Sequence, residues 1–251
     1  MLPLDVHAHI QPDIDPRELD QLSACVVAVT RTSEEFVGVT ARRDRTTVWG
    51  LGAHPGVPAA HGRFDAEGFR ELLTHTPVVG EIGLDGRSRI PPDAQRRTLD
   101  AILTILAEHP RLVSLHSSGA TGRVLDVLEA HHPQGVVLHW WRGTEAETRR
   151  ALGLGCHFSI NAAEIARPKV LPLVPRDRVL TETDHPYGDR SQTAPRRPGR
   201  LDDIEAAIAR HWDVDINGVR RQVWANLRQI ATQTATADIF PGAFQRAMLA
   251  A

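Results

Sequence analysis

Eight short runs rich in β-branched and aliphatic residues alternate with longer amphipathic stretches along this chain of 251 residues. Such runs are typical of buried parallel strands, and the stretches between them have helical periodicity. We predict a (β/α)₈ TIM barrel with added C-terminal helices, formed by residues 1–251 as a single domain. An open doubly wound sheet is the alternative, but no glycine-rich phosphate loop follows the first run. The predicted strands are Leu4–His9, Ala24–Val29, Val48–His54, Val78–Gly83, Leu112–His116, Gly135–His139, Cys156–Ile160 and Arg178–Asp184.

The clearest predicted helix is Pro92–His109, in which Leu99, Ile102, Leu103 and Leu106 form one apolar face. A polar loop rich in proline and arginine is expected to follow the eighth strand, at 184–200. The other predicted helices are Ser33–Arg43, Asp65–His75, Ala120–His132, Thr144–Leu152, Leu201–Trp212 and Ile216–Thr234.

The chemistry-bearing side chains fall at the C-terminal ends of the predicted strands, where TIM barrels carry their active sites. His7 and His9 are two residues apart, so both point to one face of a strand. Taken alone, this pair is equally well explained as hydrogen-bonded core histidines. The residues expected to converge with the pair are His54, Glu81, His116, His139 and Asp184.

Burial of so many nitrogen and oxygen ligands without a cation would leave polar groups unpaired. We therefore predict a metal site, and two divalent ions (Mg²⁺, Mn²⁺ or Zn²⁺) in preference to one. Four of these histidines (His7, His9, His116 and His139) and the two carboxylates exceed the needs of one tetrahedral site. Glu81 on the middle strand is placed to bridge two ions. The predicted reaction is metal-assisted hydrolysis, with Asp184 as both ligand and proton acceptor.

Composition limits which partners and which cellular compartment we expect for this protein. The formal net charge is −2, so the chain as a whole carries no nucleic-acid signal, and Lys169 is its only lysine. Cys25 and Cys156 lie in apolar runs and are expected to be buried thiols. No signal peptide or membrane-spanning run is recognised, which predicts a cytoplasmic protein with no membrane partner.

The ordered motifs HxH, GxHP, "GEIGLD", His, His and "TETDHP" from Leu4 to Pro186 resemble the TatD-like metal-dependent hydrolases. The resemblance implies a TIM barrel, two divalent ions and deoxyribonuclease activity, with single-stranded DNA the expected partner and exonuclease action the expected mode. One ion would be held by His7, His9, Glu81 and Asp184, and the other by Glu81, His116 and His139. His54 would support a ligand or contact substrate. The segment 223–231 is similar to the family's Asn-containing C-terminal helix.

Finer details, "VGEIGLDG", "VLHWW" and "RVLTETD", are similar to the TatD-like nuclease of the Qat anti-phage system. That similarity implies a role in antiviral defence and partner proteins encoded alongside. Glu182 shares the strand face predicted for Asp184 and is expected to support His7 or His9, or to cap a neighbouring loop.

The chain departs from the family where an arginine usually follows the fifth-strand histidine, because Ser118 stands there. Arginines on the catalytic face are expected to grip phosphate instead, with Arg142, Arg196 and Arg197 the leading candidates. A solvated arginine-rich surface is the plainer interpretation of each, and Trp140 or Trp141 is expected either to stack on a base or to pack against the wall. Further arginines on this face are Arg87, Arg89, Arg190 and Arg200.

Two other functions remain open from the sequence. A metal-dependent amidohydrolase or esterase would use the same barrel and ligands on a small molecule, and Ser118 and the near-neutral charge favour it. A largely structural subunit of a defence complex is the third possibility, although a complete ligand set argues against it.

Overall fold

The computed structural model describes residues 1–62, 64–189 and 196–251. The strands in these ranges are β1 (Leu4–Ala8), β2 (Cys25–Val29), β3 (Thr47–Gly50), β4 (Val78–Gly83), β5 (Leu112–His116), β6 (Val136–Leu138), β7 (His157–Ile160) and β8 (Val179–Thr181). Neighbours pair in parallel and in sequence order, β1 to β3 and β4 to β8. Bridges from Leu51 to Val79 and from Ala8 to His185 join the two sheets. The sheet therefore closes into a barrel, and the predicted (β/α)₈ fold is confirmed.

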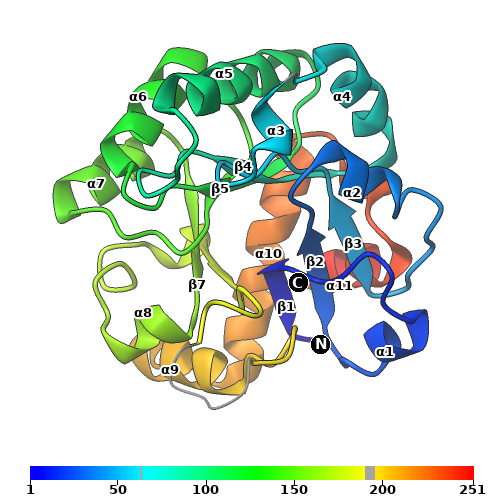
Figure 1. The fold of residues 1–251 in the computed structure, drawn as a ribbon. Coiled ribbons are helices and arrows are strands. Elements are labelled where there is room, and N and C mark those ends of the chain that lie inside the picture. The colour runs from blue at the N-terminus through cyan, green and yellow to red at the C-terminus, as the bar shows by residue number, and fades with distance from the viewer. Residues whose placement is uncertain (63, 190–195) are drawn as a thin grey trace.

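Helices surround the strands on all sides (Figure 1). They are α1 (Pro16–Asp20), α2 (Ser33–Val37), α3 (Ala59–Gly62), α4 (Ala66–Leu72), α5 (Pro92–Glu108), α6 (Thr121–His131), α7 (Glu145–Gly153), α8 (Ala162–Ala166), α9 (Asp202–Trp212), α10 (Ile216–Gln233) and α11 (Gly242–Leu249), with short 3₁₀ turns at Leu73–His75, Arg176–Arg178 and Ala237–Ile239. The sequence did not predict α1, α3, α8 and α11. Three of these have only four or five residues, too few for a clear helical period.

Two kinds of predicted boundary are wrong. The helix predicted at Ser33–Arg43 ends at Val37, because Gly38 is a poor helix former and tight turns replace the helix after it. The predicted strands also run too far toward the C-terminal end of the barrel. β3 ends at Gly50 and β8 at Thr181, so His54 and Asp184 lie in the loops that follow.

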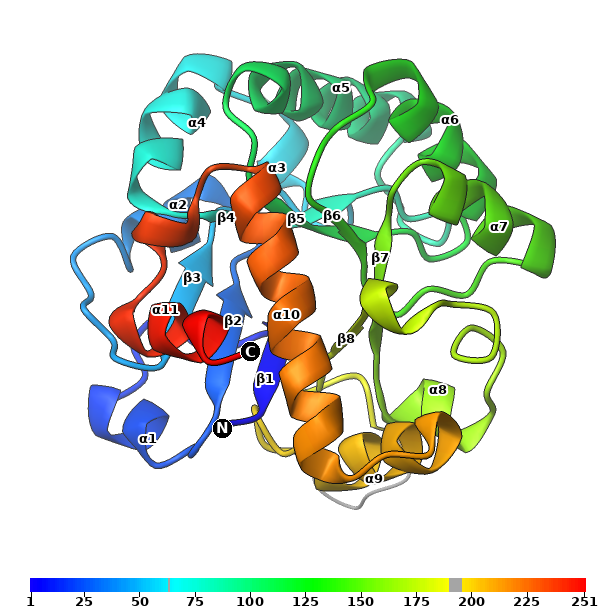
Figure 2. The same cartoon turned by 180° about the vertical axis from the view of Figure 1, so that it is seen from behind.

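Helix α10 closes the end of the barrel where the strands begin, and it crosses in front of them in Figure 2. The Asn226 amide donates to the carbonyls of Arg176 and Val179, at 2.8 and 2.7 Å. The Trp224 indole donates to the carbonyl of Leu2 at 2.8 Å. The Asn-containing segment that resembles the family helix therefore fastens this end of the barrel, and the opposite end is left for the site.

Candidate metal centre

Seven of the predicted side chains meet at the C-terminal end of the barrel. His7 lies within β1, Glu81 within β4, and His116 is the last residue of β5. The others lie in loops just beyond strand ends: His9, His54, His139 and Asp184. A ring nitrogen of each of the five histidines lies within 3.8 Å of a Glu81 carboxylate oxygen. The seventh side chain, Asp184, places Oδ1 3.6 Å from His7 Nε2. The sequence prediction of convergence is therefore correct.

Glu81 is the centre of this cluster and is 1% exposed. Its Oε1 accepts a hydrogen bond from His116 Nδ1 at 2.6 Å and lies 3.1 Å from His139 Nε2. Its Oε2 faces other imidazoles, with His9 Nε2 at 3.2 Å, His54 Nε2 at 3.4 Å and His7 Nε2 at 3.8 Å. Each carboxylate oxygen thus faces its own set of nitrogen ligands.

A close approach of backbones places Glu81 there. The Glu81 N–H donates to the Thr30 carbonyl at 3.0 Å, past Gly52. A Cβ at Gly52 would lie only 1.8 Å from that carbonyl oxygen and 3.0 Å from Glu81 N. Position 52 therefore requires glycine, and the "GAHP" motif contributes a gap as well as His54.

The histidines on either side of Glu81 are oriented from behind. His7 Nδ1 pairs with Ser114 Oγ at 2.7 Å, which directs Nε2 toward Glu81 and Asp184. The rings of His7 and His139 stack with centroids 3.8 Å apart. Fixing one ring nitrogen so that the other faces the centre is the usual arrangement of a metal-binding histidine.

Glu182 lies beside His139, and it caps the loop after β6, which is the second of the two roles predicted for it. Its Oε1 lies 3.5 Å from His139 Nδ1. The Ser159 hydroxyl, the Asn161 amide and the Trp140 N–H all donate to this fully buried carboxylate. β8 ends before Glu182, so strand alternation does not set its direction, and donors beside β7 draw it under His139.

Asp184 completes the cluster from the loop after β8. Its Oδ1 lies 3.6 Å from His7 Nε2 and 3.8 Å from His9 Nε2. The residue has a φ of 47°, a left-handed conformation that aspartate tolerates better than most side chains. Asp5, buried beneath, accepts hydrogen bonds from the Thr183 and Gly199 N–H groups and so anchors this loop.

The buried carboxylates and imidazoles of the cluster shift one another's pKa values. Burial alone would raise the pKa of Glu81, but His54, His116 and His139 hold it well below its ordinary value. Burial would lower the pKa of His116, yet Glu81 and Asp85 raise it to about 9. Burial raises the pKa of Asp184 to about 7. In the metal-free protein, protons on imidazoles therefore offset the Glu81 charge, and cations would replace those protons on binding.

The donor set fits divalent cations. Three combinations bring ligand atoms within 4.8 Å of one another: His7, His139 and Asp184; His7, His9 and Glu81; and His54, Glu81 and His116. Glu81 Oε2 and His116 Nε2 are buried and make no hydrogen bond, and buried polar atoms of this kind are normally satisfied. His54, predicted to support a ligand or contact substrate, lies in the third of these combinations.

Comparison with known proteins identifies the family of this chain. Residues 4–232 match the family model of the TatD related DNases. The chain belongs to this family. A similar relative is the 3'-5' ssDNA/RNA exonuclease TatD of Erwinia billingiae, 31% identical over 196 residues that span 71% of this chain and 75% of the relative. Its counterpart in Shigella flexneri is 28% identical over 219 residues, or 80% and 84% of the two chains.

Solved structures agree with the TatD-family barrel. YjjV, a TatD homologue from Escherichia coli, superposes with a TM-score of 0.78 at 22% identity, over 90% of this chain and 97% of that one. An uncharacterized amidohydrolase from Saccharomyces cerevisiae gives 0.73 at 14% identity, over 92% and 99%. At these identities the likeness shows the fold alone. This chain is a hydrolase of the metal-dependent TatD family. In the described part of the chain, no helix is long and apolar enough to cross a bilayer.

The arginines predicted to bind substrate have different fates in this TatD-family member. Arg196 pairs with Asp189 at 2.7 Å and with Asp203 at 2.6 Å and is 8% exposed, so its guanidinium is already committed within the fold. Arg197 lines a hollow of about 340 Å³ that also contains His9 and Tyr187. Arg142 is exposed in a larger cavity next to Trp140. Arg87, Arg89 and Arg200 are exposed, and Arg190 lies outside the described residues.

Sequence reasoning missed several residues of this TatD-family site. Asp85 follows β4, where the sequence favours a structural turn residue over a substrate-side carboxylate, and its Oδ2 lies 3.4 Å from His116 Nε2. Arg167 and Lys169 line the same cavity as Arg142. Their signal was two cations beside Pro168 in a chain with a single lysine, but no motif connected them with β6.

Proposed function

We propose that this TatD-family hydrolase is a two-metal exonuclease that cleaves phosphodiester bonds in single-stranded DNA or RNA. The observation that carries the proposal is the placement of Glu81, whose two carboxylate oxygens face different sets of imidazoles. A carboxylate in that position suits a bridge between two ions, and two-metal sites are frequent in nucleases. The names of the relatives in Erwinia and Shigella, which act on single-stranded DNA and RNA, support the substrate.

Two divalent ions bound here would supply Lewis acidity that activates water and neutralises charge developing on a phosphate. The residues of the chain determine the rest. The side chains of His9 and His54 are 14% and 20% exposed, so they border the solvent-facing side of the metal centre. A single-stranded nucleic acid would reach the metal centre from that side. Asp184, close to both His7 and His9, is placed to accept the proton of the attacking water. Glu182 and Ser114 keep His139 and His7 aligned.

The decisive experiment combines cleavage with metal analysis. Purified protein is incubated with Mg²⁺, Mn²⁺ or Zn²⁺ and with 3′- or 5′-labelled single strands, with Glu81→Gln as the comparison. We expect shortening from one end, lost at least about 100-fold in the variant, because removal of an outer-shell partner alone costs about 10–100-fold. Elemental analysis should show two ions in the wild type and fewer in Glu81→Gln.

A small-molecule amidohydrolase or esterase is the competing function. Ser118, in place of the usual family arginine, is the observation that favours it. Protein shown to hold both ions but inert toward single- and double-stranded DNA and toward RNA would contradict the nuclease proposal. Turnover of amide or lactone substrates by the same preparation, lost in Glu81→Gln, would then establish the alternative.

We also propose that the enzyme acts in the cytoplasm in defence against phage, together with partner proteins. Its support is the similarity of "VLHWW" and its neighbouring motifs to the TatD-like nuclease of the Qat system. The test is phage plating on cells that carry the gene with its neighbours, wild type against Glu81→Gln. Equal protection by both would contradict a catalytic role in defence and favour a structural subunit.

A further inference from the structure

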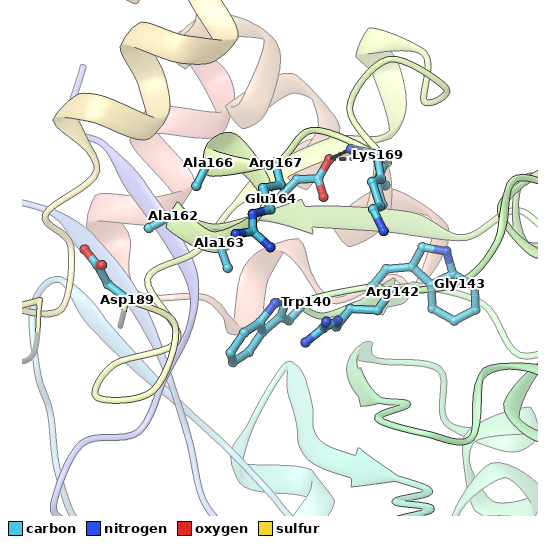
Figure 3. A pocket seen from close by; sticks show the side chains of 12 residues that line it. Trp140, Arg142, Gly143, Ala162, Ala163, Glu164, Ala166, Arg167, Lys169 and Asp189 are labelled. Atoms are coloured by element: carbon cyan, nitrogen blue, oxygen red, sulfur yellow. Dashed lines mark hydrogen bonds between the residues drawn. The ribbon is translucent and has the colours of Figure 1, made fainter. Parts of the chain in front are cut away.

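A cavity of about 560 Å³ is lined by Trp140, the residue that follows His139, and by none of the candidate metal ligands. Its size falls in the range of about 300–1,000 Å³ that is typical of ligand sites. One wall is the loop after β6, with Trp140 and Arg142, and the other is α8 with the loop that follows, including Arg167 and Lys169. In Figure 3, Arg167 and Lys169 extend from one wall toward Trp140 and Arg142 on the other.

The cavity carries excess positive charge. Arg142, Arg167 and Lys169 are exposed, and within the described ranges their side chains make no hydrogen bond or ion pair. The carboxylates of the lining are already engaged. Glu164 Oε1 accepts from the N–H groups of residues 169, 170 and 171, and Asp189 pairs with Arg196. Three cations around one hollow suit an anion with several charged groups, such as a phosphodiester backbone.

The cavity is also joined mechanically to the metal centre. Trp140 directly follows His139, and its N–H donates to Glu182 Oε1 at 3.0 Å. The same oxygen lies 3.5 Å from His139 Nδ1. One buried carboxylate therefore holds both a candidate metal ligand and the backbone that presents the indole.

We propose that this cavity binds the nucleotides adjoining the bond that is cleaved, in a single-stranded nucleic acid. A base stacks on the Trp140 indole, and Arg142, Arg167 and Lys169 contact the neighbouring phosphates. Stacking on an aromatic ring requires an unpaired base and tolerates any sequence, so the cavity selects single strands without reading bases. These cations supply phosphate contacts on a face of the barrel where position 118 is a serine. The inference rests on the proposed nuclease function for its substrate.

The test measures binding and cleavage separately. Binding of a fluorescent oligothymidine to the full-length protein is followed by anisotropy in EDTA, where no cleavage occurs, over a range of salt. The variant Arg142→Ala/Arg167→Ala/Lys169→Ala should lower the slope of log affinity against log salt by about 2, at about 0.7 for each phosphate contact. Arg97→Ala is the matched control, because Arg97 is exposed on the outer helix α5. Its slope should equal that of the wild type.

The stacking contact is tested by a pair of variants. Trp140→Ala should weaken binding about 5- to 150-fold, the range for loss of a stacked base, whereas Trp140→Tyr should keep most of the affinity. In cleavage assays the triple variant should raise KM and leave kcat within about threefold. An unchanged salt slope in the triple variant, whatever the tryptophan variants do, would overturn the proposal.

The results also separate this inference from the nuclease function. Wild type that cleaves strands while the triple variant binds and cleaves equally well would refute the cavity and leave the nuclease intact. Wild type that binds strands through these residues but cleaves none when metal-loaded would refute the nuclease and leave a binding site. A duplex that binds as tightly as a single strand would refute the stacking contact.

Discussion

The two ends of the barrel differ in how their buried polar side chains are held. Where the strands begin, the Asn226 amide donates to two carbonyls, the Trp224 indole donates to one, and Arg220 pairs with Glu205 at 2.6 Å. Thr47 Oγ1 and both ring nitrogens of His157 are buried at this end without a hydrogen bond, but neither residue belongs to a cluster of candidate metal ligands. Where the strands end, Glu81 Oε2 and His116 Nε2 are buried without a hydrogen bond. Satisfied groups stabilise a fold, and unsatisfied ones in a cluster indicate a ligand. The difference separates the residues that hold the barrel from those that work in it.

Removal of metal should have the largest effect, and only at the C-terminal end. Chelation is expected to abolish cleavage. It should also lower the melting temperature by on the order of 10–20 °C relative to protein with two ions, each at 100 times its dissociation constant. Cleavage and the melting temperature should both return to their original values when ions are restored.

Because ligands bind metal in their deprotonated form, ion affinity should fall as the pH is lowered. Calorimetry with and without EDTA checks this, and a melting temperature indifferent to ions in the wild type would contradict it.

Glu182→Gln should show that the carboxylate that orients His139 matters as much as the candidate ligands themselves. The amide keeps the size of the side chain but loses the charge beside His139 Nδ1. We expect a 10- to 100-fold loss in activity or ion affinity, the usual effect of an outer-shell partner. Titration with Mn²⁺ separates the two, since excess ion should rescue activity if affinity alone is weakened. Ser159→Ala, which removes one donor to the same carboxylate, should have a smaller effect in the same direction.

The sequence predicted which candidate ligands meet because each lies in a strand or in the loop just beyond one, and a parallel barrel brings strand ends together whatever the helices do. His7, Glu81 and Asp184 needed only their place in the order of strands. Contacts between distant positions were not predictable in this way. Ser114 behind His7 lies 107 positions away, and the pairing of Arg196 with Asp189 and Asp203 depends on the path of a loop. The order of the strands thus determines where the candidate ligands lie, and side-chain packing determines which other residues contact them.

Asn226→Ala should affect the other end, with a smaller effect and of a different kind. The variant leaves the carbonyls of Arg176 and Val179 without their donor in a buried setting. A loss of about 1–3 kcal/mol in the free energy of unfolding is expected. It corresponds to a decrease of about 2–12 °C in melting temperature for a chain of this size. Cleavage measured well below that temperature should be unchanged, as should ion content. A selective loss of activity in a fully folded variant would show that the two ends are coupled.

The two thiols should show the smallest effect. Cys25 begins β2 and Cys156 directly precedes β7, so both belong to the end of the barrel opposite the metals. Burial raises the pKa of each to about 12, so neither forms appreciable thiolate near neutral pH. We expect iodoacetamide to leave both unmodified in the native protein and to label both after denaturation, as mass spectrometry would show. Ion content should not change during the native incubation. Rapid native labelling accompanied by loss of metal would mean that this end opens together with the site, and the division between a holding end and a working end would then fail.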